Sequence, residues 1–508
     1  MPRCKPVDRS PRLLPVVLSE QIQSGTFEFA LDHLVDHELN LDALDVRFNN
    51  DEVGASAYDP RVMLKIVLLA YSRGLISSRR IEHACLHHVQ FIAISGDSQP
   101  SYTHIAKFVR ELGPQIKALF TEVLLTCDRM GLIGRQMFAI DGVKLPANAS
   151  KERSGTHAEL RHRAARLDQA AAKIIALHQS QDDAGQDHEL STKHQDRIEA
   201  LRKEAQVTRD FVAGNKPRLN RKGQELKTNI TDPDSAKMAT SKGVIQGYAA
   251  QAAVDSAHQV IVAAEVTGSG SEQAMLLPMV QASSTVREAH TLITADAGYH
   301  SKDNIAALRE ANIPALIADN QMRQRDERLA EQAKHKAKPD PLYDKGARAK
   351  EAPIRLYRPV DFTYHAPTNS CICPAGQHLY SNGNHCMVRG KVHHRFTGAK
   401  QSCVPCQRRD QCLRKPQSTQ VRHVSIFAKN QPSPHAAIEL MKQAIDSARG
   451  RHLYSQRIGT VEPVFGNIRH NKRLNRFTLR GKAKVNAQWS LYCLVHNIEK
   501  LANHGYAQ

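Results

Sequence analysis

Two short apolar runs that end in an aspartate constrain the fold of this chain more than any other feature. Residues 138–141 read FAID and residues 293–296 read ITAD, so each run leads what looks like a buried β-strand into an acidic side chain. A carboxylate at the end of a buried strand is costly unless a cation lies beside it. The chain must therefore fold so that Asp141 and Asp296 each meet a positive partner.

Further strand-like runs surround these two. Residues 245–267 read as an antiparallel hairpin divided at DSAH, and PALIAD at 314–319 follows a helix-like segment after Asp296. A strand, a hairpin and then strand, helix and strand predict an α/β fold with a mixed sheet, whose order resembles that of ribonuclease-H-like domains. The first strand, at 136–145, is expected to close at Asp141, which would bring both aspartates to one sheet edge.

The pattern of the N-terminal part is helical. Residues 1–133 carry apolar side chains at three- and four-residue spacing, which predicts an N-terminal helical domain. Its basic residues suit either a helix-turn-helix-like DNA reader or a bundle whose charges only face water. Residues 152–226 read as an inserted helical hairpin, either two solvated helices or an arm that tracks DNA. The basic residues in question are Arg79, Arg80, Lys107 and Arg110.

The charge of the chain favours a polyanionic partner. Among its 508 residues, 70 Lys and Arg stand against 51 Asp and Glu, a formal net charge of +19. Nucleic acid and an anionic membrane surface would both fit. The longest apolar run, at 61–71, is too short to span a membrane and contains Lys65, and prolines interrupt the apolar part of the N-terminus. We therefore expect a soluble intracellular protein, with nucleic acid as its partner.

Six of the ten cysteines lie between residues 371 and 412. In a large intracellular chain such crowding indicates a metal site more than a set of disulfides, and a C-x-x-C pair favours tetrahedral Zn²⁺. The sequence predicts a structural zinc in a cysteine-rich insertion at 361–425; reduced, buried thiols are the alternative. Cys371 and Cys386 could replace or join the ligands. The expected ligands are Cys373, Cys403, Cys406 and Cys412.

A divalent cation would reconcile the two aspartates, whose charges otherwise repel one another. Mg²⁺ or Mn²⁺ is held by a few carboxylate oxygens, and two such ions can drive phosphodiester chemistry. Glu462 is the candidate third acid. Asp232, Asp234 and Asp255 compete for these roles but lie in turn-like contexts.

The surroundings of Glu462 leave two arrangements open. If the segment is helical beyond Pro463, then Arg469 and Arg473 lie within about 20° of Glu462 at 100° per residue, and one face holds an acid with guanidinium groups suited to phosphates. Alternatively, Pro463 places Glu462 at the entrance of the helix, because the residue before proline avoids helical geometry.

Five blocks of sequence resemble those of bacterial insertion-sequence transposases of the DDE type, in the branch with a cysteine-rich insertion before the glutamate. The blocks are FAIDGVKLPANASK, TDPDSAKM, GYAAQAAVD, ITADAGYHS and YSQRIGTVEPVFGNIRHN. The resemblance covers nearly the whole chain. It implies that Asp141, Asp296 and Glu462 are the catalytic, metal-binding acids of a ribonuclease-H-like core.

Four residues of the last block are similar to the tyrosine-arginine-glutamate-lysine signature of related transposases: Tyr454, Arg457, Glu462 and Arg469. There are two departures. Four residues separate Arg457 from Glu462 where the signature usually has three, and arginine stands where lysine is usual. Together with the helix geometry, the signature gives Tyr454, Arg457, Arg469 and Arg473 as the expected DNA-binding residues.

These observations give one expected organisation. A DNA-binding helical domain occupies 1–133, the catalytic core occupies 134–345 and 435–508, and the cysteine-rich insertion lies between its parts. The resemblance implies an enzyme that cleaves double-stranded DNA at inverted-repeat ends and transfers the 3′-hydroxyl to target DNA. It also implies a homo-oligomer when DNA is bound, in the bacterial cytoplasm at the nucleoid, with no membrane partner. A nuclease that never joins DNA and a catalytically decayed DNA-binding protein are the alternatives.

Overall fold

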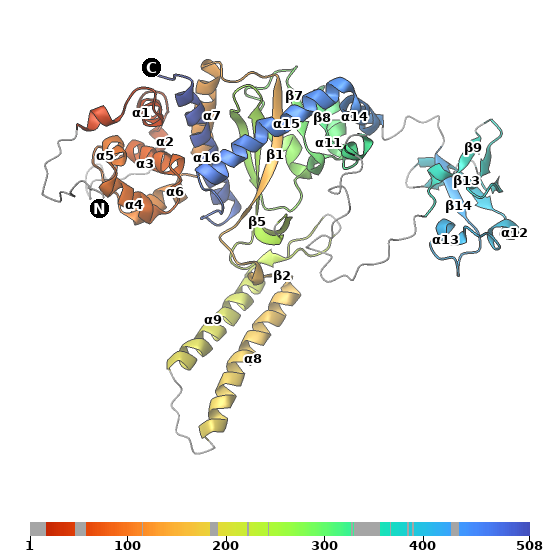
Figure 1. Cartoon of the computed structure of the whole chain (residues 1–508). Coiled ribbons are helices and arrows are strands. Elements are labelled where there is room, and N and C mark those ends of the chain that lie inside the picture. The colour runs from red at the N-terminus through yellow and green to blue at the C-terminus, as the bar shows by residue number, and fades with distance from the viewer. Residues whose placement is uncertain are drawn as a thin grey trace, which may run out of the picture. The chain divides into compact units, whose positions relative to one another are not determined.

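The computed structural model describes residues 17–45, 57–113, 115–182, 192–220, 223–241, 243–326, 329, 356–365, 367–383, 386–388, 391–427 and 436–507. The chain forms two compact units, of which the first comprises Met1–Leu342 and Leu440–Gln508 and the second comprises Tyr343–Glu439 (Figure 1). The second unit is therefore inserted in sequence between two parts of the first.

The N-terminal part of the first unit is helical and packs around α3. In α3 the Asp59 side chain caps the helix by accepting a hydrogen bond from the Arg61 backbone N at 2.7 Å, and Pro60 occupies the first turn. Lys65 tolerates burial within the apolar run because its Nζ lies 2.6 Å from both Asp32 and Asp36 of α1. The elements are η1 (Leu18–Gln21), α1 (Phe27–His37), α2 (Asp42–Asp45), α3 (Pro60–Ser72), α4 (Ser78–His87), α5 (Val89–Ser95), α6 (Tyr102–Glu111) and α7 (Ile116–Arg129).

A mixed sheet forms the centre of the first unit. Its strand order is β4-β5-β1-β7-β8, and β6 pairs with β5. The pairs β1–β5, β4–β5 and β5–β6 are antiparallel, whereas β1–β7 and β7–β8 are parallel, so the expected antiparallel and parallel sides are both present. The strands are β1 (Met137–Pro146), β4 (Ala236–Thr240), β5 (Gly243–Asp255), β6 (Ile261–Thr267), β7 (Leu292–Ala295) and β8 (Ala315–Ile317).

The first strand does not close at Asp141, so that prediction is wrong. β1 continues to Pro146 because β5 pairs with it in antiparallel register as far as Pro146 opposite Gly247. The parallel partner β7 is shorter, and its last residue, Ala295, lies opposite Ile140. Asp141 is therefore the first residue of β1 beyond the end of β7, within a strand that is still paired on its other side.

The polar segment after β1 forms the expected helical hairpin. Its helices pack through a small core of Ala171, Ile198 and Leu201, and the pair Arg209–Asp168 at 2.5 Å joins their surfaces. Figure 1 shows the hairpin extending away from the sheet. Its elements are η2 (Lys151–Arg153), β2 (Ser154–Gly155), α8 (His157–Asp182), α9 (Thr192–Gly214) and β3 (Thr228–Asn229).

The remaining helices of the first unit cover the sheet. Trp489 of α16 is fully buried and donates its Nε1 hydrogen to the Gln251 carbonyl at 2.9 Å, so it ties this helix to the sheet. Across the described residues, no helix combines the length and apolar character needed to cross a membrane. The elements are η3 (Gln273–Met275), α10 (Leu276–Ala282), η4 (Ala297–Tyr299), α11 (Lys302–Glu310), η5 (Met322–Arg325), α14 (Ala436–Asp446), α15 (Ala448–Gly466), the π-helical turn η8 (Asn467–Asn471) and α16 (Lys482–Asn503).

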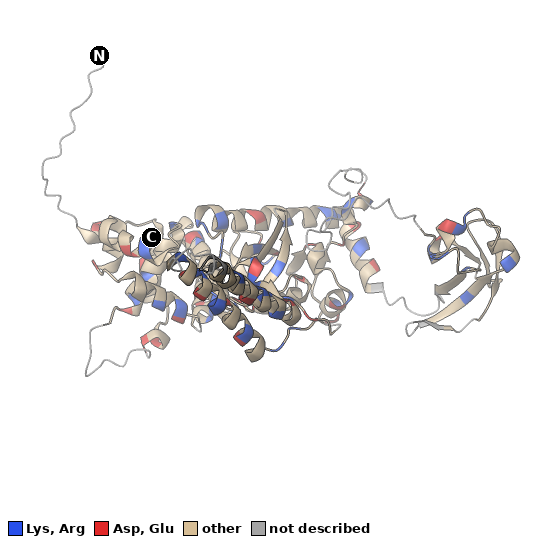
Figure 2. Cartoon of the chain, turned by 90° about the horizontal axis from the view of Figure 1, so that it is seen from below, with Lys and Arg blue, Asp and Glu red and all other residues tan. Residues whose placement is uncertain are grey.

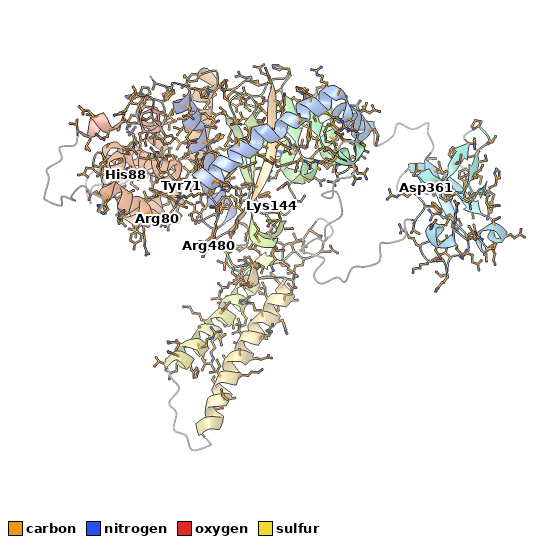
Figure 3. All side chains as sticks on the ribbon, in the orientation of Figure 1. Tyr71, Arg80, His88, Lys144, Asp361 and Arg480 are labelled. Carbon is orange, nitrogen blue, oxygen red and sulfur yellow. The ribbon has the colours of Figure 1, made fainter. Side chains whose placement is uncertain are left out.

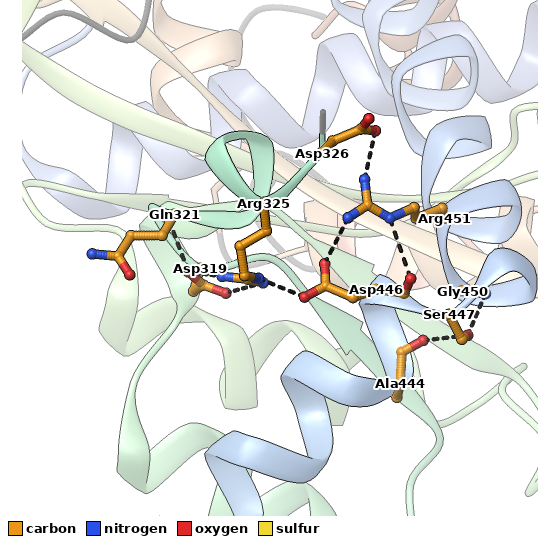
Figure 4. Close-up of polar contacts among 9 residues, drawn as sticks. All are labelled: Asp319, Gln321, Arg325, Asp326, Ala444, Asp446, Ser447, Gly450 and Arg451. Atoms are coloured by element: carbon orange, nitrogen blue, oxygen red, sulfur yellow. Dashed lines mark hydrogen bonds and ion pairs between the residues drawn. The ribbon is translucent and has the colours of Figure 1, made fainter. Parts of the chain in front are cut away.

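A charged network joins the segment after β8 to the junction of α14 and α15 (Figure 4). Arg325 donates to both carboxylate oxygens of Asp319, at 2.9 and 2.7 Å, and its Nε donates to Asp446 at 2.5 Å. Arg451 donates to Asp326 at 2.5 Å and to Asp446 at 3.2 Å. The network connects the two chain segments that flank the inserted unit in sequence, and it anchors the start of α15.

The second unit is a small antiparallel sheet with order β12-β13-β11-β10-β9, and β14 pairs with β13. Its core contains Phe362, Cys371, Leu379, Phe396 and Val424. The elements are η7 (Pro359–Asp361), β9 (Thr363–His365), β10 (Ser370–Ile372), β11 (His378–Ser381), β12 (Cys386–Val388), β13 (Lys391–Gly398), α12 (Lys400–Cys403), α13 (Arg409–Cys412) and β14 (His423–Phe427).

Candidate active site at the edge of the sheet

The register of β1 and β7 brings the two aspartates together. Ile140 pairs with Ala295, so Asp141 and Asp296 follow side by side at the end of this parallel pair. Burial raises the pKa of Asp296, and the negative charge of Asp141 raises it further. Each carboxylate is oriented by a backbone N–H at 2.8 Å, from Gly142 to Asp141 and from Gly298 to Asp296. The predicted meeting of the two acids is therefore present in the structure.

The closest cation to Asp141 is a guanidinium from α15. This helix packs against β1, and Arg457 Nη1 donates to Asp141 Oδ2 at 2.7 Å, with only 10 % of the arginine side chain and 20 % of the aspartate side chain exposed. Burial alone would lower the pKa of Arg457, but the Asp141 carboxylate reverses this and the pKa is raised. The Arg457 guanidinium lies 5.7 Å from the ring centroid of Tyr454. Two residues expected to contact DNA thus lie beside the carboxylates.

A third carboxylate, which the sequence did not reveal, lies in the connection between β6 and η3. Burial raises the pKa of Glu272 to about 7; Lys144 opposes this shift, while Asp296 and Asp141 add to it. A Cβ atom added to Gly298 would lie 3.0 Å from Asp296 Oδ1 and 3.3 Å from Glu272 Oε2. Lys144 belongs to β1 (Figure 3). Nothing in the pattern marked Glu272, because it is a single acid in the Gly- and Ser-rich stretch TGSGSEQ.

Two buried polar side chains lie beneath these acids. The Tyr299 hydroxyl donates to Gln251 Oε1, and burial together with the charges of Glu272, Asp141 and Asp296 raises the pKa of Tyr299. The tyrosine therefore remains protonated. Gln251 is fully buried, and its Nε2 has no hydrogen-bond partner among the described residues.

The close approach of the Gln251 amide to β1 explains the glycine that follows the first aspartate. A Cβ atom added to Gly142 would lie 2.4 Å from Gln251 Nε2, so a side chain at that position would displace the amide. Gly142 therefore lets the amide lie against the strand immediately next to Asp141.

Glu462 lies elsewhere on α15. It is exposed, and the five positions that separate it from Arg457 turn it about 140° around the helix. In the described parts of the chain, no hydrogen bond or ion pair joins Glu462 to Asp141 or Asp296. The helix runs through Pro463 to Gly466, so the alternative that placed Glu462 at a helix entrance is wrong.

The expected common face of Glu462, Arg469 and Arg473 is also wrong. A π-helical turn at Asn467–Asn471 follows α15 and contains Arg469, and Arg473 has a left-handed φ of 58°. These two features break the 100° period on which the expectation depended. Arg473 is exposed, and its side chain packs near Gly74, where an added Cβ would lie 3.1 Å from Arg473 Cγ.

The acids form only part of a metal site. No three His, Cys, Asp or Glu side chains of the described chain lie close enough together to hold a metal ion. The pair Asp141 and Asp296 nevertheless suits a hard cation, because it offers carboxylate oxygens that repel one another above a buried amide without a partner. The two aspartates therefore fit Mg²⁺ or Mn²⁺ as part of a ligand set, to which water and substrate oxygens would add.

Two family models match the chain. The Transposase DDE domain matches residues 372–502, and the Transposase domain (DUF772) matches residues 16–111. Both matches support an insertion-sequence transposase of the DDE type. This confirms the resemblance seen in the sequence blocks. The first match includes Arg457 and Glu462 of the transposase, and the second includes its N-terminal helices as far as α6. Comparisons with curated proteins and with solved structures gave no match.

The second unit of the transposase gathers the four thiols that were expected to bind zinc. Cys373, Cys403, Cys406 and Cys412 all line one pocket. Burial raises the pKa of Cys412; Arg422 opposes the rise, and the other three thiols add to it. Among the described residues, no three of these thiols lie close enough together to hold a metal ion, so they are neighbours without a closed ligand geometry.

The two alternative cysteines lie apart from this pocket. Cys371 is fully buried in the core of the second unit, and Cys386 belongs to β12, near Gly383. Neither lines the pocket that the four thiols share.

The N-terminal helices of the transposase expose the basic residues noted in the sequence. Arg79 and Arg80 lie on α4, and Lys107 and Arg110 lie on α6, all exposed. The Arg79 guanidinium lies 5.1 Å from the ring centroid of Tyr102 at the start of α6. Figure 3 labels Arg80 and His88 in this part, and Figure 2 shows Lys and Arg interspersed with Asp and Glu over the molecule. The exposed pair of helices suits phosphate contacts.

Proposed function

We propose that this transposase cleaves DNA at the inverted-repeat ends of its insertion sequence and transfers the freed 3′-hydroxyl to target DNA. Asp141, Asp296 and Glu462 are the proposed catalytic acids, with Mg²⁺ or Mn²⁺ as cofactor. The main support is the pairing of Ile140 with Ala295, which sets two carboxylates next to one another at the end of a parallel strand pair.

A ribonuclease-H-like core is part of this proposal. Its support is the arrangement of β6, β5 and β1 as antiparallel neighbours, followed by β7 and β8 parallel to β1. The order in sequence is a strand, a hairpin and then strand, helix and strand, as in that class of domain. The match to a Transposase DDE domain adds to this support.

The residues of the chain have distinct tasks in this chemistry. Bound divalent cations would activate first water and then the 3′-hydroxyl, and would stabilise the leaving oxygen. Asp141 and Asp296 would hold the cation through carboxylates that backbone N–H groups already orient. Arg457 fixes Asp141 in position through its ion pair. Lys144 adds positive charge on the same strand, where a phosphate would arrive.

The proposed catalytic role of Glu462 has different support from that of the two aspartates. It lies within the residues matched by the Transposase DDE domain and within the block YSQRIGTVEPVFGNIRHN. Its exposed position on α15 means that a catalytic role requires this helix to shift when DNA binds. The DNA contacts of Tyr454, Arg457, Arg469 and Arg473 are proposed on the same basis. A DNA contact of Arg457 would compete with its ion pair to Asp141.

Labelled inverted-repeat DNA tests the proposal directly. With Mg²⁺ the transposase should release the 3′ end and join it to target DNA, and Asp296→Asn should reduce both products by roughly a thousandfold or more. Binding of the DNA should change little. The matched control is Asp303→Asn, an exposed acid on α11. Activity of Asp296→Asn equal to that of the control would contradict the assignment.

The same assay separates the two alternatives. A nuclease would give cleaved ends without joined product, and a decayed transposase would bind the ends without cutting them in either Mg²⁺ or Mn²⁺. The joined product is therefore the decisive observation.

The proposal includes a structural zinc in the second unit, held by Cys373, Cys403, Cys406 and Cys412. Its support is the pocket that all four line, and the hydrogen bond of the Gln377 backbone N to Cys373 Sγ at 3.3 Å, which orients one thiol. Thiolates at such a site bind Zn²⁺ tetrahedrally. Absence of zinc from the purified protein would remove this part of the proposal and leave the catalytic part standing.

The proposed partner is double-stranded DNA, both the terminal inverted repeats and the target. We assign the repeats to α4 and α6, whose basic side chains would make affinity fall steeply as salt rises. Joining two ends to one target needs a homo-oligomer in the DNA-bound state. The proposed location is the bacterial cytoplasm, at the nucleoid.

A further inference from the structure

We propose that Glu272 is a carboxylate of the reaction centre and binds the divalent cation together with Asp141 and Asp296. This inference rests on the proposed function, and it names a residue that neither the sequence blocks nor the family matches assign. The residues matched by the Transposase DDE domain begin at 372, well after Glu272.

Distance is the first argument. Asp296 Oδ1 and Glu272 Oε2 lie 3.0 and 3.3 Å from a single point, the position of a Cβ added to Gly298, so the two oxygens are at most about 6.3 Å apart. Mg²⁺ binds oxygen at about 2.1 Å and usually keeps several of its waters. As they lie in the described structure, no three acids are close enough to hold one ion, so Glu272 would reach the ion after a side-chain rotation or through a bound water.

Hydrogen bonds connect the residue after Glu272 to the loop that follows Asp296. Gln273 Nε2 donates to the His300 carbonyl at 2.8 Å. Asn304 Nδ2 donates to the carbonyls of Gln273, at 2.7 Å, and of Tyr299, at 2.8 Å. Although the connection between β6 and η3 is rich in Gly and Ser, these bonds hold Glu272 close to Asp296.

Glu272 has no other role in the described structure. Its carboxylate makes no hydrogen bond or ion pair with the described residues, yet it is partly buried beside two acids of like charge. Three carboxylates without a shared cation repel one another. A cation among them would remove that repulsion.

Two buried polar side chains, Tyr299 and Gln251, lie near the acids. Tyr299 lies within the field of all three carboxylates and donates to Gln251, whose Nε2 is buried and unpartnered among the described side chains. A bound water or a ligand oxygen above Gly142 would give this amide an acceptor. The described side chains next to the acids thus leave this amide without an acceptor, which a ligand oxygen or a water would supply.

Metal binding to the DNA-free transposase tests the inference. Mn²⁺ titration, followed by calorimetry, should show Glu272→Gln weakening the metal affinity by about tenfold or more, and Asp296→Asn should do the same. The control is Glu310→Gln, an exposed glutamate at the end of α11 that should bind Mn²⁺ like the unmodified chain. Equal Mn²⁺ affinity for Glu272→Gln and Glu310→Gln would overturn the inference, as would a lack of Mn²⁺ binding by the unmodified chain.

A second variant and a second readout complete the test. Glu272→Asp keeps the negative charge on a side chain that is one methylene shorter, so it should lose less Mn²⁺ affinity than Glu272→Gln. It replaces Glu272→Gln in the test if that variant fails to fold. In the DNA cleavage assay, raised Mn²⁺ should restore Glu272→Gln in part. If the unmodified chain binds Mn²⁺ through Glu272 but joins no DNA, then the proposed function fails and this inference stands. If it joins DNA and Glu272→Gln matches the control, only this inference fails.

Discussion

The acids of the first unit and the thiols of the second differ in what holds them together. Asp141 and Asp296 are set by strand register, and a guanidinium within the chain, Arg457, already balances part of their charge. In the second unit, Arg409 instead donates to main-chain carbonyls, including those of Cys403 and Pro416, and so connects loops without pairing with a thiolate.

This difference indicates that the two units would depend on a bound metal in different ways. The acids can assemble before a metal binds, because the sheet and an internal cation support them. The thiols come from turns and one-turn helices around a small core, so a bound metal would supply much of the order there. Metal removal should therefore stop chemistry in the first unit and loosen structure in the second.

The largest structural effect should come from the thiols. Cys406→Ser should release the zinc and, with it, binding free energy on the order of 10 kcal/mol. Hydrogen exchange of residues 391–427 should then accelerate, because the loops lose their common ligand. Cys386→Ser, which changes a thiol outside the shared pocket, is the control. If Cys406→Ser keeps its zinc and its hydrogen exchange is unchanged, then the second unit does not depend on a bound metal more than the first unit does.

The next effect concerns the internal cation. Arg457→Met leaves the Asp141 carboxylate without its partner and should lower the free energy of unfolding by about 2–3 kcal/mol. Urea unfolding followed by the fluorescence of Trp489, the only tryptophan, measures this for the first unit. Added Mn²⁺ should recover part of the loss by replacing the missing charge.

Arg449→Met provides the matched control for that experiment. Arg449 lies on the same helix, α15, and is exposed. Equal unfolding free energies for Arg449→Met and Arg457→Met would mean that the internal cation does not support the acids.

The charged network of Figure 4 should have a smaller effect. Arg325→Ala removes bonds to Asp319 and Asp446 and should lower the free energy of unfolding of the first unit by about 1–2 kcal/mol. The control, Arg323→Ala, changes an exposed arginine of the same short helix. If both variants unfold at the same urea concentration, the network does not anchor α15.

The smallest effect is a pH dependence confined to the first unit. Burial lowers the pKa of His496 to about 3, and the ring accepts a hydrogen bond from Asn467 while its Nε2 donates to the Gln259 carbonyl. The unfolded chain binds a proton near pH 6.5, so between pH 6.5 and 3 it holds more protons than the folded chain, and stability falls as the pH falls.

His496→Gln should reduce that loss by about 1 kcal/mol at pH 5.5. Urea unfolding by Trp489 fluorescence at pH 7.5 and 5.5 measures the difference. Because protonation of thiolates would also release zinc at low pH, this variant separates the acid response of the first unit from that of the second. The same pH slope with and without His496 would contradict the assignment.

The sequence predicted the parts of this fold that depend on local pattern. The hairpin of β5 and β6 and the strand before Asp296 follow from the apolar pattern of their own residues. The end of β1 was mistaken because it depends on pairing with β5, about a hundred residues further along the chain.

The site was predictable to the extent that residue type revealed it. Asp141 and Asp296 end apolar runs and were found. Arg457 was read as a DNA contact, since its bond to Asp141 spans 316 positions and leaves no mark in either segment. Glu272 was missed because a single acid in a polar connection has no periodic signal. The face expected for Glu462 and Arg473 failed at the π-helical turn, which residue spacing does not reveal.

The central claim is that the aspartates at the end of β1 and β7 bind the metal that carries out DNA cleavage. Asp296→Cys tests it most directly, because a thiolate favours softer ions over Mg²⁺. The account predicts that this variant does not cleave inverted-repeat DNA in Mg²⁺ and regains cleavage in Mn²⁺. Cleavage in Mg²⁺ at the rate of the unmodified chain would contradict it.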